Sequence, residues 1–177
     1  FSGNGAICGN ANISLLDGSA LALLTQFDYI GTPWRNLYGI GGDGSISYRN
    51  ATAMRNAIKW KAHDGKTSED YYFIQTLNEM NLKSGTNYRI ASKEQTQLFG
   101  GISDKLEDND APPFVIAGTM PRLNHDVRNL VLEMCPEVKT IFPALHNPNC
   151  FGAHPNAEEC SKHICALSDP KFRPSGC

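Results

Sequence analysis

Apolar residues recur at helical spacing in several parts of the chain. The clearest case begins at Asn50 or Thr52, where the apolar positions Ala53, Met54, Ala57, Ile58 and Trp60 fit a period of 3.6 residues. Two further predicted helices have possible capping residues at their starts. Asp17 or Ser19 would cap the helix that begins near residue 19, and Ser92 would cap the helix that ends at residue 99. The sequence therefore predicts helices over 19–27, from 50 or 52 to 60, and over 68–80, 92–99 and 126–134.

Short apolar or alternating runs separate these helices and end at glycine or proline. They predict strands over 27–31, 45–48, 88–91 and 115–118, and the end of a strand within 1–9. The intervening segments 39–44, 61–66 and 100–113 are expected to be loops, the last of them acidic. Helices and strands in this order favour an α/β fold, a layered domain with a mixed sheet.

Composition and charge then narrow the class of protein. The chain has 177 residues, and its 16 Lys and Arg against 18 Asp and Glu give a formal charge of −2. A nucleic-acid partner is disfavoured, because phosphate binding requires a basic surface. A membrane span is not expected, since no window approaches about 18 consecutive apolar residues. The first residue is Phe1, so we expect a processed product or a piece of a longer chain.

The cysteines point to an oxidising compartment. Their number is even, and the triplets beginning at Asn12 and Asn50 are N-glycosylation acceptors. We therefore expect a protein that is secreted or in the lumen of the secretory pathway. Six cysteines allow fifteen pairings, and pairing within the segment after 136, which is rich in Pro, Asn and Cys and predicted to be loop-like, is favoured. The cysteines are Cys8, Cys135, Cys150, Cys160, Cys165 and Cys177.

Zinc binding is the alternative for the end of the chain. Its Cys and His residues lie close together in sequence, but their spacing matches no specific zinc pattern, so disulfides are favoured. The residues concerned are Cys150, His154, Cys160, His163 and Cys165.

Four short segments carry the candidate chemistry. An extended run ends in Thr32-Pro33-Trp34, and a glycine-rich bend, Gly42-Asp43-Gly44-Ser45, precedes a helix. Adjacent carboxylates, Glu69-Asp70, stand at a helix start, and His154 follows Phe151-Gly152-Ala153. Glycines of this kind let a ligand or another segment approach the backbone closely.

Together these segments resemble a glycosyltransferase-like family of the GT-A type, catalogued mainly as a domain of unknown function. The matching motifs are the run 28–34, the bend and strand 42–50, the acidic pair with the aromatic residues after it, and the late Gly-x-His. The resemblance covers about 1–100 and the vicinity of His154. It implies a domain over 1–145 that corresponds to the C-terminal, acceptor-side half of a GT-A fold, with a Cys-rich tail over 146–177 packed on it.

The resemblance implies sugar transfer from a nucleotide-sugar to a hydroxyl of a glycan acceptor, with a divalent cation, Mn²⁺ or Mg²⁺, at the diphosphate. Glu69 or Asp70 would be the general base. The bend formed by Gly42, Asp43, Gly44 and Ser45 would pass close to the donor sugar, and Trp34 would form the floor of the acceptor pocket. His154 would lie near the metal, and Asn4 stands where the family carries a metal-binding Asp.

Simpler interpretations stay open for each residue. The acidic pair is also typical of a favourable helix start, Trp34 of a core residue and His154 of a solvated loop residue. Asn4 replaces a carboxylate, and the nucleotide-binding half that normally comes first would have to come from a missing N-terminal segment or a protein partner. The second hypothesis is therefore a non-catalytic protein, either carbohydrate-binding or an extracellular structural or assembly protein. The enzymatic hypothesis requires folding to bring residues 42–45, 69–70 and 154 to one cleft.

Overall fold

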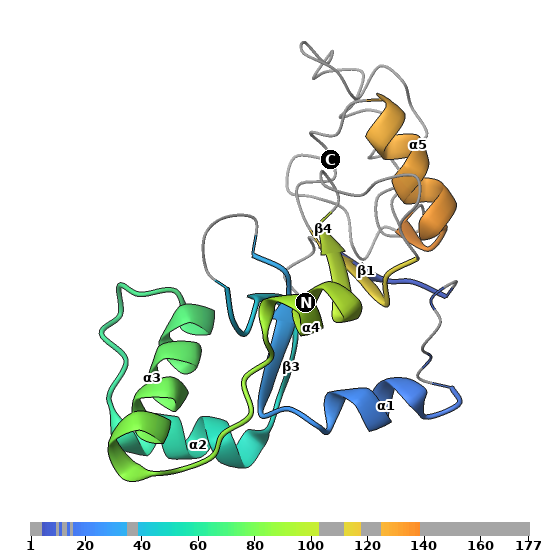
Figure 1. The fold of residues 1–177 in the computed structure, drawn as a ribbon. Helices are drawn as coiled ribbons and strands as arrows, with labels where there is room; N and C mark the ends of the chain where they lie inside the picture. The colour runs from blue at the N-terminus through green and yellow to red at the C-terminus, as the bar shows by residue number, and fades with distance from the viewer. Residues whose placement is uncertain are drawn as a thin grey trace, which may run out of the picture.

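A computed structural model describes residues 5–9, 11, 14, 16–34, 39–102, 112–117 and 125–138. These residues form a mixed α/β fold with helices and two small sheets (Figure 1). The helices are α1 (Ser19–Leu24), α2 (Ala51–Trp60), α3 (Glu69–Ser84), α4 (Lys93–Phe99) and α5 (His125–Met134). The strands are β1 (Gly5–Ile7), β2 (Tyr29–Thr32), β3 (Asp43–Arg49), β4 (Gly100–Ile102) and β5 (Val115–Ala117).

The strands form two separate sheets. The first joins the first strand of the chain to its last two, and the second joins the two strands that lie between them in sequence. The first has the order β1-β5-β4, in which β5 pairs antiparallel with β1 and parallel with β4. The second is the antiparallel pair of β2 and β3, whose register shifts between Gly31 and Thr32. Mixed pairing in the first sheet confirms the expected mixed α/β class.

Local sequence signals explain where three helices begin or end. The side-chain oxygen of Asn50 accepts hydrogen bonds from the backbone N–H groups of Thr52 and Ala53 and so caps α2. Ser92 forms a capping box with Gln95 at the start of α4, as the sequence predicts. Helix α3 runs past its predicted end and stops at Gly85, which has a left-handed backbone with φ of 65°.

The buried side chains form three clusters. One lies around the Cys8–Cys135 disulfide beneath α5, and one lies where α1 and α4 meet strands of both sheets. The third packs α2 and α3 against β2, and its buried members are Tyr29, Ala53, Met54, Ala57, Ile74 and Leu77. This third cluster fixes the position of α3 relative to the two-stranded sheet (Figure 1).

Several predicted boundaries are wrong, and helix α1 ends at Leu24 instead of residue 27. Strand β2 lies at 29–32 instead of 27–31, and Asp43 and Gly44 belong to strand β3 instead of the loop 39–44. The segment 100–113 begins with strand β4, because Gly100 to Ile102 pair with β5. Within the predicted strand 88–91, Ile90 forms a single isolated bridge to Tyr29. The differences in the strands arise from pairings between distant segments, which local patterns do not specify.

The described cysteines form one disulfide, Cys8–Cys135, with 4.8 Å between their Cα atoms. This pair joins the residue after β1 to the residue after α5, and the predicted pairing among the tail cysteines stays a prediction. Cys150, Cys160, Cys165 and Cys177 lie outside the described residues, as does the predicted tail 146–177. Among the helices of the described part, none is long and apolar enough to cross a membrane.

Candidate functional site

Strand β3 touches the start of α3 at Gly44. The backbone N–H of Gly44 donates to Asp70 Oδ2 at 3.0 Å. A Cβ added at Gly44 would lie 2.7 Å from Arg49 Nη2 and 2.8 Å from Glu69 Oε1, distances that real Cβ atoms do not adopt. The added Cβ would also lie 2.9 Å from Asp70 Cβ, so glycine lets the strand backbone approach the acidic pair without displacing these three side chains.

The Glu69 carboxylate is held by Arg49. The guanidinium donates to Oε2 through Nη1 and to Oε1 through Nη2, the latter at 2.8 Å. The Arg49 group also donates through Nε to Ser47 Oγ at 2.9 Å and lies 5.3 Å from the centre of the Tyr29 ring. Burial has the largest single effect on the pKa of Arg49 and lowers it. The hydrogen bonds that Arg49 donates to Glu69, the charge of that carboxylate and the Tyr29 side chain together outweigh burial, and the pKa is raised overall. Arg49 is therefore a fixed cation, and the Glu69 side chain beside it is 55% exposed.

Asp70 has a different environment. The residue is only 8% exposed, and both carboxylate oxygens accept backbone N–H groups, Oδ2 from Gly44 and Oδ1 from Tyr71 at 2.7 Å. These bonds fix the bend against α3. Asp43, the first residue of β3, accepts from the Ser45 N–H at 2.8 Å through Oδ1.

The Tyr29 hydroxyl is a buried polar group close to this ion pair. The residue is fully buried, and its hydroxyl makes no hydrogen bond of ordinary geometry, although Arg49 and Ser47 lie nearby. Burial raises the pKa of Tyr29 strongly, and the positive charge of Arg49 offsets only part of that effect. The phenol is therefore neutral at physiological pH.

The bend at Gly42 is set by a close approach of two backbones. Gly42 has φ of 88°, and a Cβ there would lie 2.5 Å from the Gly31 carbonyl oxygen. Only glycine satisfies both conditions. The chain from Gly39 to Gly44 then runs along α3, because a Cβ at Gly41 would meet Ile74 of that helix.

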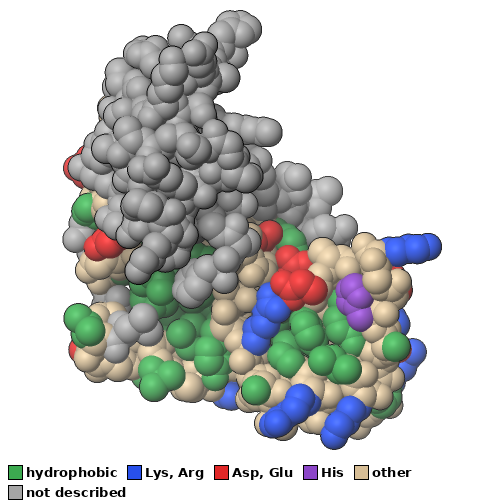
Figure 2. All heavy atoms as spheres, turned by 180° about the vertical axis from the view of Figure 1, so that it is seen from behind, with side chains coloured by type: hydrophobic (Ala, Val, Ile, Leu, Met, Phe, Trp, Pro, Cys, Tyr) green, Lys and Arg blue, Asp and Glu red, His purple; other side chains and the backbone are tan. Residues whose placement is uncertain are grey.

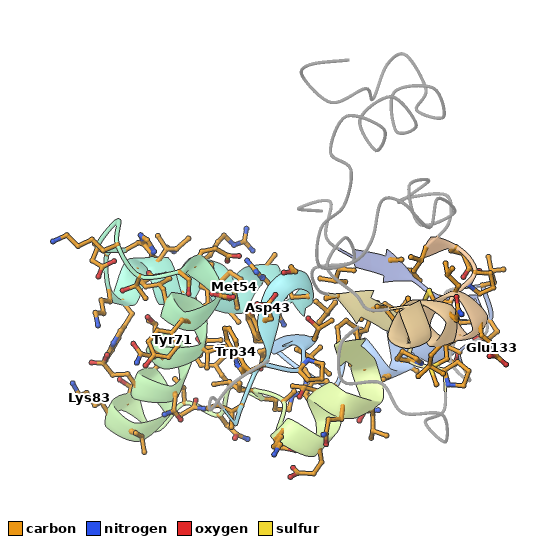
Figure 3. The ribbon with its side chains drawn as sticks, turned by 90° about the horizontal axis from the view of Figure 1, so that it is seen from above. Trp34, Asp43, Met54, Tyr71, Lys83 and Glu133 are labelled. Carbon is orange, nitrogen blue, oxygen red and sulfur yellow. A yellow bond between two sulfur atoms is a disulfide. The ribbon has the colours of Figure 1, made fainter. Side chains whose placement is uncertain are left out.

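Trp34 lies at the other end of this segment. Its indole Nε1 donates to the Ile40 carbonyl at 3.0 Å, and its partly buried ring packs against the third core cluster. The ring also lines a hollow of about 220 Å³ together with Gly39, Ile40, Tyr71, Ile74, Gln75 and Asn78. Figure 3 shows Trp34 beside Tyr71 of α3. Trp34 is thus both a packing residue and part of a surface hollow.

The structure brings together most of the described candidates. Gly44, Asp43, Glu69 and Asp70 form one cluster, and Ser45 follows in the same strand. Asn50 caps α2. The remaining predicted positions, Asn4, Asn12 and His154, lie outside the described residues.

Sequence reasoning did not assign roles to Arg49 and Tyr29. Arg49 belongs to the 42–50 motif. It lies two residues after Ser47, and side chains two apart on a strand share one face, which allows the hydrogen bond between them. Its acidic partner is twenty residues further along the chain, so no local pattern shows the pair. Figure 2 shows acidic and basic side chains against each other on a face that also carries hydrophobic side chains.

Within the described ranges, no three His, Cys, Asp or Glu side chains are grouped so as to hold a metal ion. The predicted metal residues are not among them. Comparison of the chain with protein-family models, with curated proteins and with solved structures found no match.

Proposed function

We propose that this chain is glycosyltransferase-like and transfers a sugar from a nucleotide-sugar to a hydroxyl of a glycan acceptor. The observation that supports this proposal is the contact between the backbone of Gly44 and the acidic pair at the start of α3. It joins two motifs, far apart in sequence, that the transfer hypothesis requires to share one site.

The two carboxylates have different roles in this proposal. Glu69 is the general base because it is the exposed carboxylate, whereas Asp70 is buried and holds the bend through Gly44. Glu69 takes the proton of the acceptor hydroxyl, and the oxygen forms a bond to the anomeric carbon. The bond from that carbon to the diphosphate breaks, and the diphosphate leaves with the electron pair. Arg49 stays charged beside Glu69 throughout.

A divalent cation, Mn²⁺ or Mg²⁺, belongs to this proposal as the group that neutralises the leaving diphosphate. The described residues alone do not form its site. Asn4 and His154 are its proposed protein ligands because of the family resemblance alone, and the nucleotide pocket is assigned to a further N-terminal segment or a protein partner.

A second candidate function is supported by the same ion pair. Glu69 is bound at both oxygens by Arg49, and both oxygens of Asp70 accept backbone N–H groups. Carboxylates whose oxygens are all hydrogen-bonded in this way can stabilise the fold without taking part in a reaction. The second candidate is a non-catalytic carbohydrate-binding or extracellular structural protein that has kept the scaffold.

Both candidates are proposed to be secreted or lumenal proteins. The Cys8–Cys135 pair supports this location, because disulfides persist mainly in oxidising compartments.

Calorimetry and product analysis separate the two functions. The longest natural chain containing this sequence is titrated with a panel of nucleotide-sugars in the presence of Mn²⁺, and hydrolysis of the donors is followed by mass spectrometry. We expect heat of binding and slow hydrolysis for at least one donor. Glu69→Gln should lower the rate about 10²- to 10⁴-fold. Glu79→Gln is the matched control, since Glu79 is an ion-paired Glu near the other end of α3. Absence of both heat and hydrolysis would overturn the transfer proposal.

A further inference from the structure

The hollow beside Trp34 is a second candidate binding site, separate from the acidic pair. It is formed by one face of α3 and by the segment that leads into the glycine bend. Tyr71, Gln75 and Asn78 are spaced at i, i+4 and i+7, so they share one side of the helix. Gly39, Ile40 and Trp34 close the hollow from the opposite side.

The polar groups of the hollow are neutral amides. Gln75 and Asn78 are exposed, and neither side chain makes a hydrogen bond to another described residue. Each amide offers two N–H donors and one acceptor oxygen. A polyol matches such groups, because each hydroxyl both donates and accepts. The aromatic rings of Trp34 and Tyr71 supply the apolar area that binding sites for small molecules generally use.

Its described lining and its size favour a neutral ligand over a whole nucleotide-sugar. The seven described residues that line the hollow are uncharged, so they supply no cation for a diphosphate. The volume of about 220 Å³ is below that of pockets for drug-sized ligands, which begin at about 300 Å³. The hollow therefore fits a single neutral ring.

Its position relates it to the acidic pair. Gln75 lies six residues after Glu69 on the same helix, which corresponds to about 9 Å along the axis. The segment from Gly39 to Gly44 connects the two places, since it borders the hollow at one end and contacts Asp70 at the other. In the view of Figure 3, Trp34 lies between Tyr71 of α3 and Asp43, the first residue of β3.

We infer that this hollow is a subsite for one uncharged hexose residue, with Trp34 and Tyr71 against the ring and Gln75 and Asn78 bonded to its hydroxyls. The inference that the bound sugar belongs to the glycan acceptor rests on the proposed function. The inference that the hollow binds a sugar does not depend on that function. The Trp34 indole N–H is already bonded to Ile40, so the indole contributes its ring and not its donor.

Tryptophan fluorescence tests the subsite directly. The chain has two tryptophans, so Trp60→Phe leaves Trp34 as the single reporter. This variant is titrated with the methyl glycosides of glucose, galactose and mannose and with N-acetylglucosamine. We expect a saturable change in emission with at least one sugar, with a Kd of about 1 mM as suits a single ring. Glucuronic acid, an anionic sugar of the same size, should bind no more tightly.

A pair of amide variants then locates the site. In the same background, Gln75→Ala should weaken binding about tenfold, whereas Gln97→Ala on α4 should leave it unchanged. No saturable change with any sugar, an equal loss in both variants, or tighter binding of glucuronic acid would overturn the subsite. If a sugar binds here but no nucleotide-sugar is bound or hydrolysed, the transferase proposal fails and the subsite stays. If a donor is hydrolysed but no sugar binds here, the subsite fails and the transferase proposal stays.

Discussion

Arg49 of β3 and Glu69 of α3 are joined by two parallel hydrogen bonds between guanidinium and carboxylate. The pair connects the last residue of a strand with the first residue of a helix, twenty positions apart. The geometry is bidentate and is supported by the Tyr29 ring beneath the guanidinium. Arginine suits this position better than lysine, because only a planar fork makes both bonds and lies over a ring.

Replacing Arg49→Lys is expected to lower the free energy of unfolding by about 1–2 kcal/mol, through loss of the second hydrogen bond and of the ring contact. Urea denaturation measures this change. Arg55→Lys is the matched control, because Arg55 is exposed on α2 and, within the described part of the chain, bonds to nearby Thr52 alone. An equal effect of both substitutions would contradict a structural role for the ion pair.

Substituting Gly44→Ala is expected to cost about 1–3 kcal/mol, because the new methyl group would push apart Arg49, Glu69 and Asp70. The same substitution at Gly39 brings no described atom within 4 Å of the added one and should change stability by less than about 0.5 kcal/mol. Thermal unfolding of the two variants gives the comparison. If Gly44→Ala is as stable as Gly39→Ala, the close contact between β3 and α3 does not exist.

The Cys8–Cys135 bond is expected to stabilise the fold by about 2–5 kcal/mol, because it closes a long loop in the unfolded chain. The double variant Cys8→Ala with Cys135→Ala should therefore lower Tm by about 4 to 20 °C. Peptide mapping of the unreduced protein is the direct check, and it should recover the two cysteines in one linked peptide. Recovery of either one linked to another cysteine would show that the pairing is wrong.

Acid should loosen the loop between α2 and α3. The pKa of Asp64 is lowered to about 2, mainly by the hydrogen bond from the Thr67 backbone N–H and also by bonds from Lys66 N–H and the Thr67 hydroxyl. Its carboxylate is exposed and, since its folded pKa is below the unfolded value of about 3.9, stabilises the fold above about pH 4. That contribution is lost as the pH falls from about 4 to 2.

NMR titration of the Asp64 carboxyl carbon should give this pKa directly. Thr67→Val removes one donor and should raise the Asp64 pKa towards its ordinary value while leaving the backbone bonds in place. A pKa near 4 in the unaltered protein would contradict the observed hydrogen bonds.

Asn50 combines two proposed roles that use different atoms. Its oxygen caps α2, while an N-glycan would be attached through its nitrogen. Thr52→Ala should abolish the glycan and keep the cap, whereas Asn50→Ala should also cost about 1 kcal/mol of stability. Intact mass from a secreting host, before and after glycosidase, gives the glycan result. A wild-type protein without glycan mass at this position would contradict the glycosylation prediction.

Elements with local signals were predicted well from the sequence. Helices α2 and α4 begin where Asn50 and Ser92 indicate, since a capping bond involves residues only two or three positions apart. The predicted strand boundaries were wrong where backbone segments far apart in the sequence pair with each other. The approach of Gly42 to Gly31 sets the register shift in the β2–β3 pair, and no local pattern contains that contact.

The candidate site was predicted in part. The glycines and the acidic pair were identified because motifs mark them, and the structure brings Gly44 and Asp70 into contact. The ion pair between Arg49 and Glu69 was not predicted, because the sequence does not show which of its many charged residues pair when they lie twenty positions apart. The Cys8–Cys135 pairing was one of many that spacing allowed, and its selection depends on β1 lying beside β5 and near α5.

The disulfide has one more consequence, for proteolysis. Residues 8 and 135 are covalently joined, and the chain between them includes the glycine bend, the acidic pair and the whole of α3. A protease that cuts once anywhere in that interval produces two polypeptides that stay attached to each other. They would migrate as a single species until a reducing agent is added, so limited digestion of this protein is informative only when gels with and without reductant are compared.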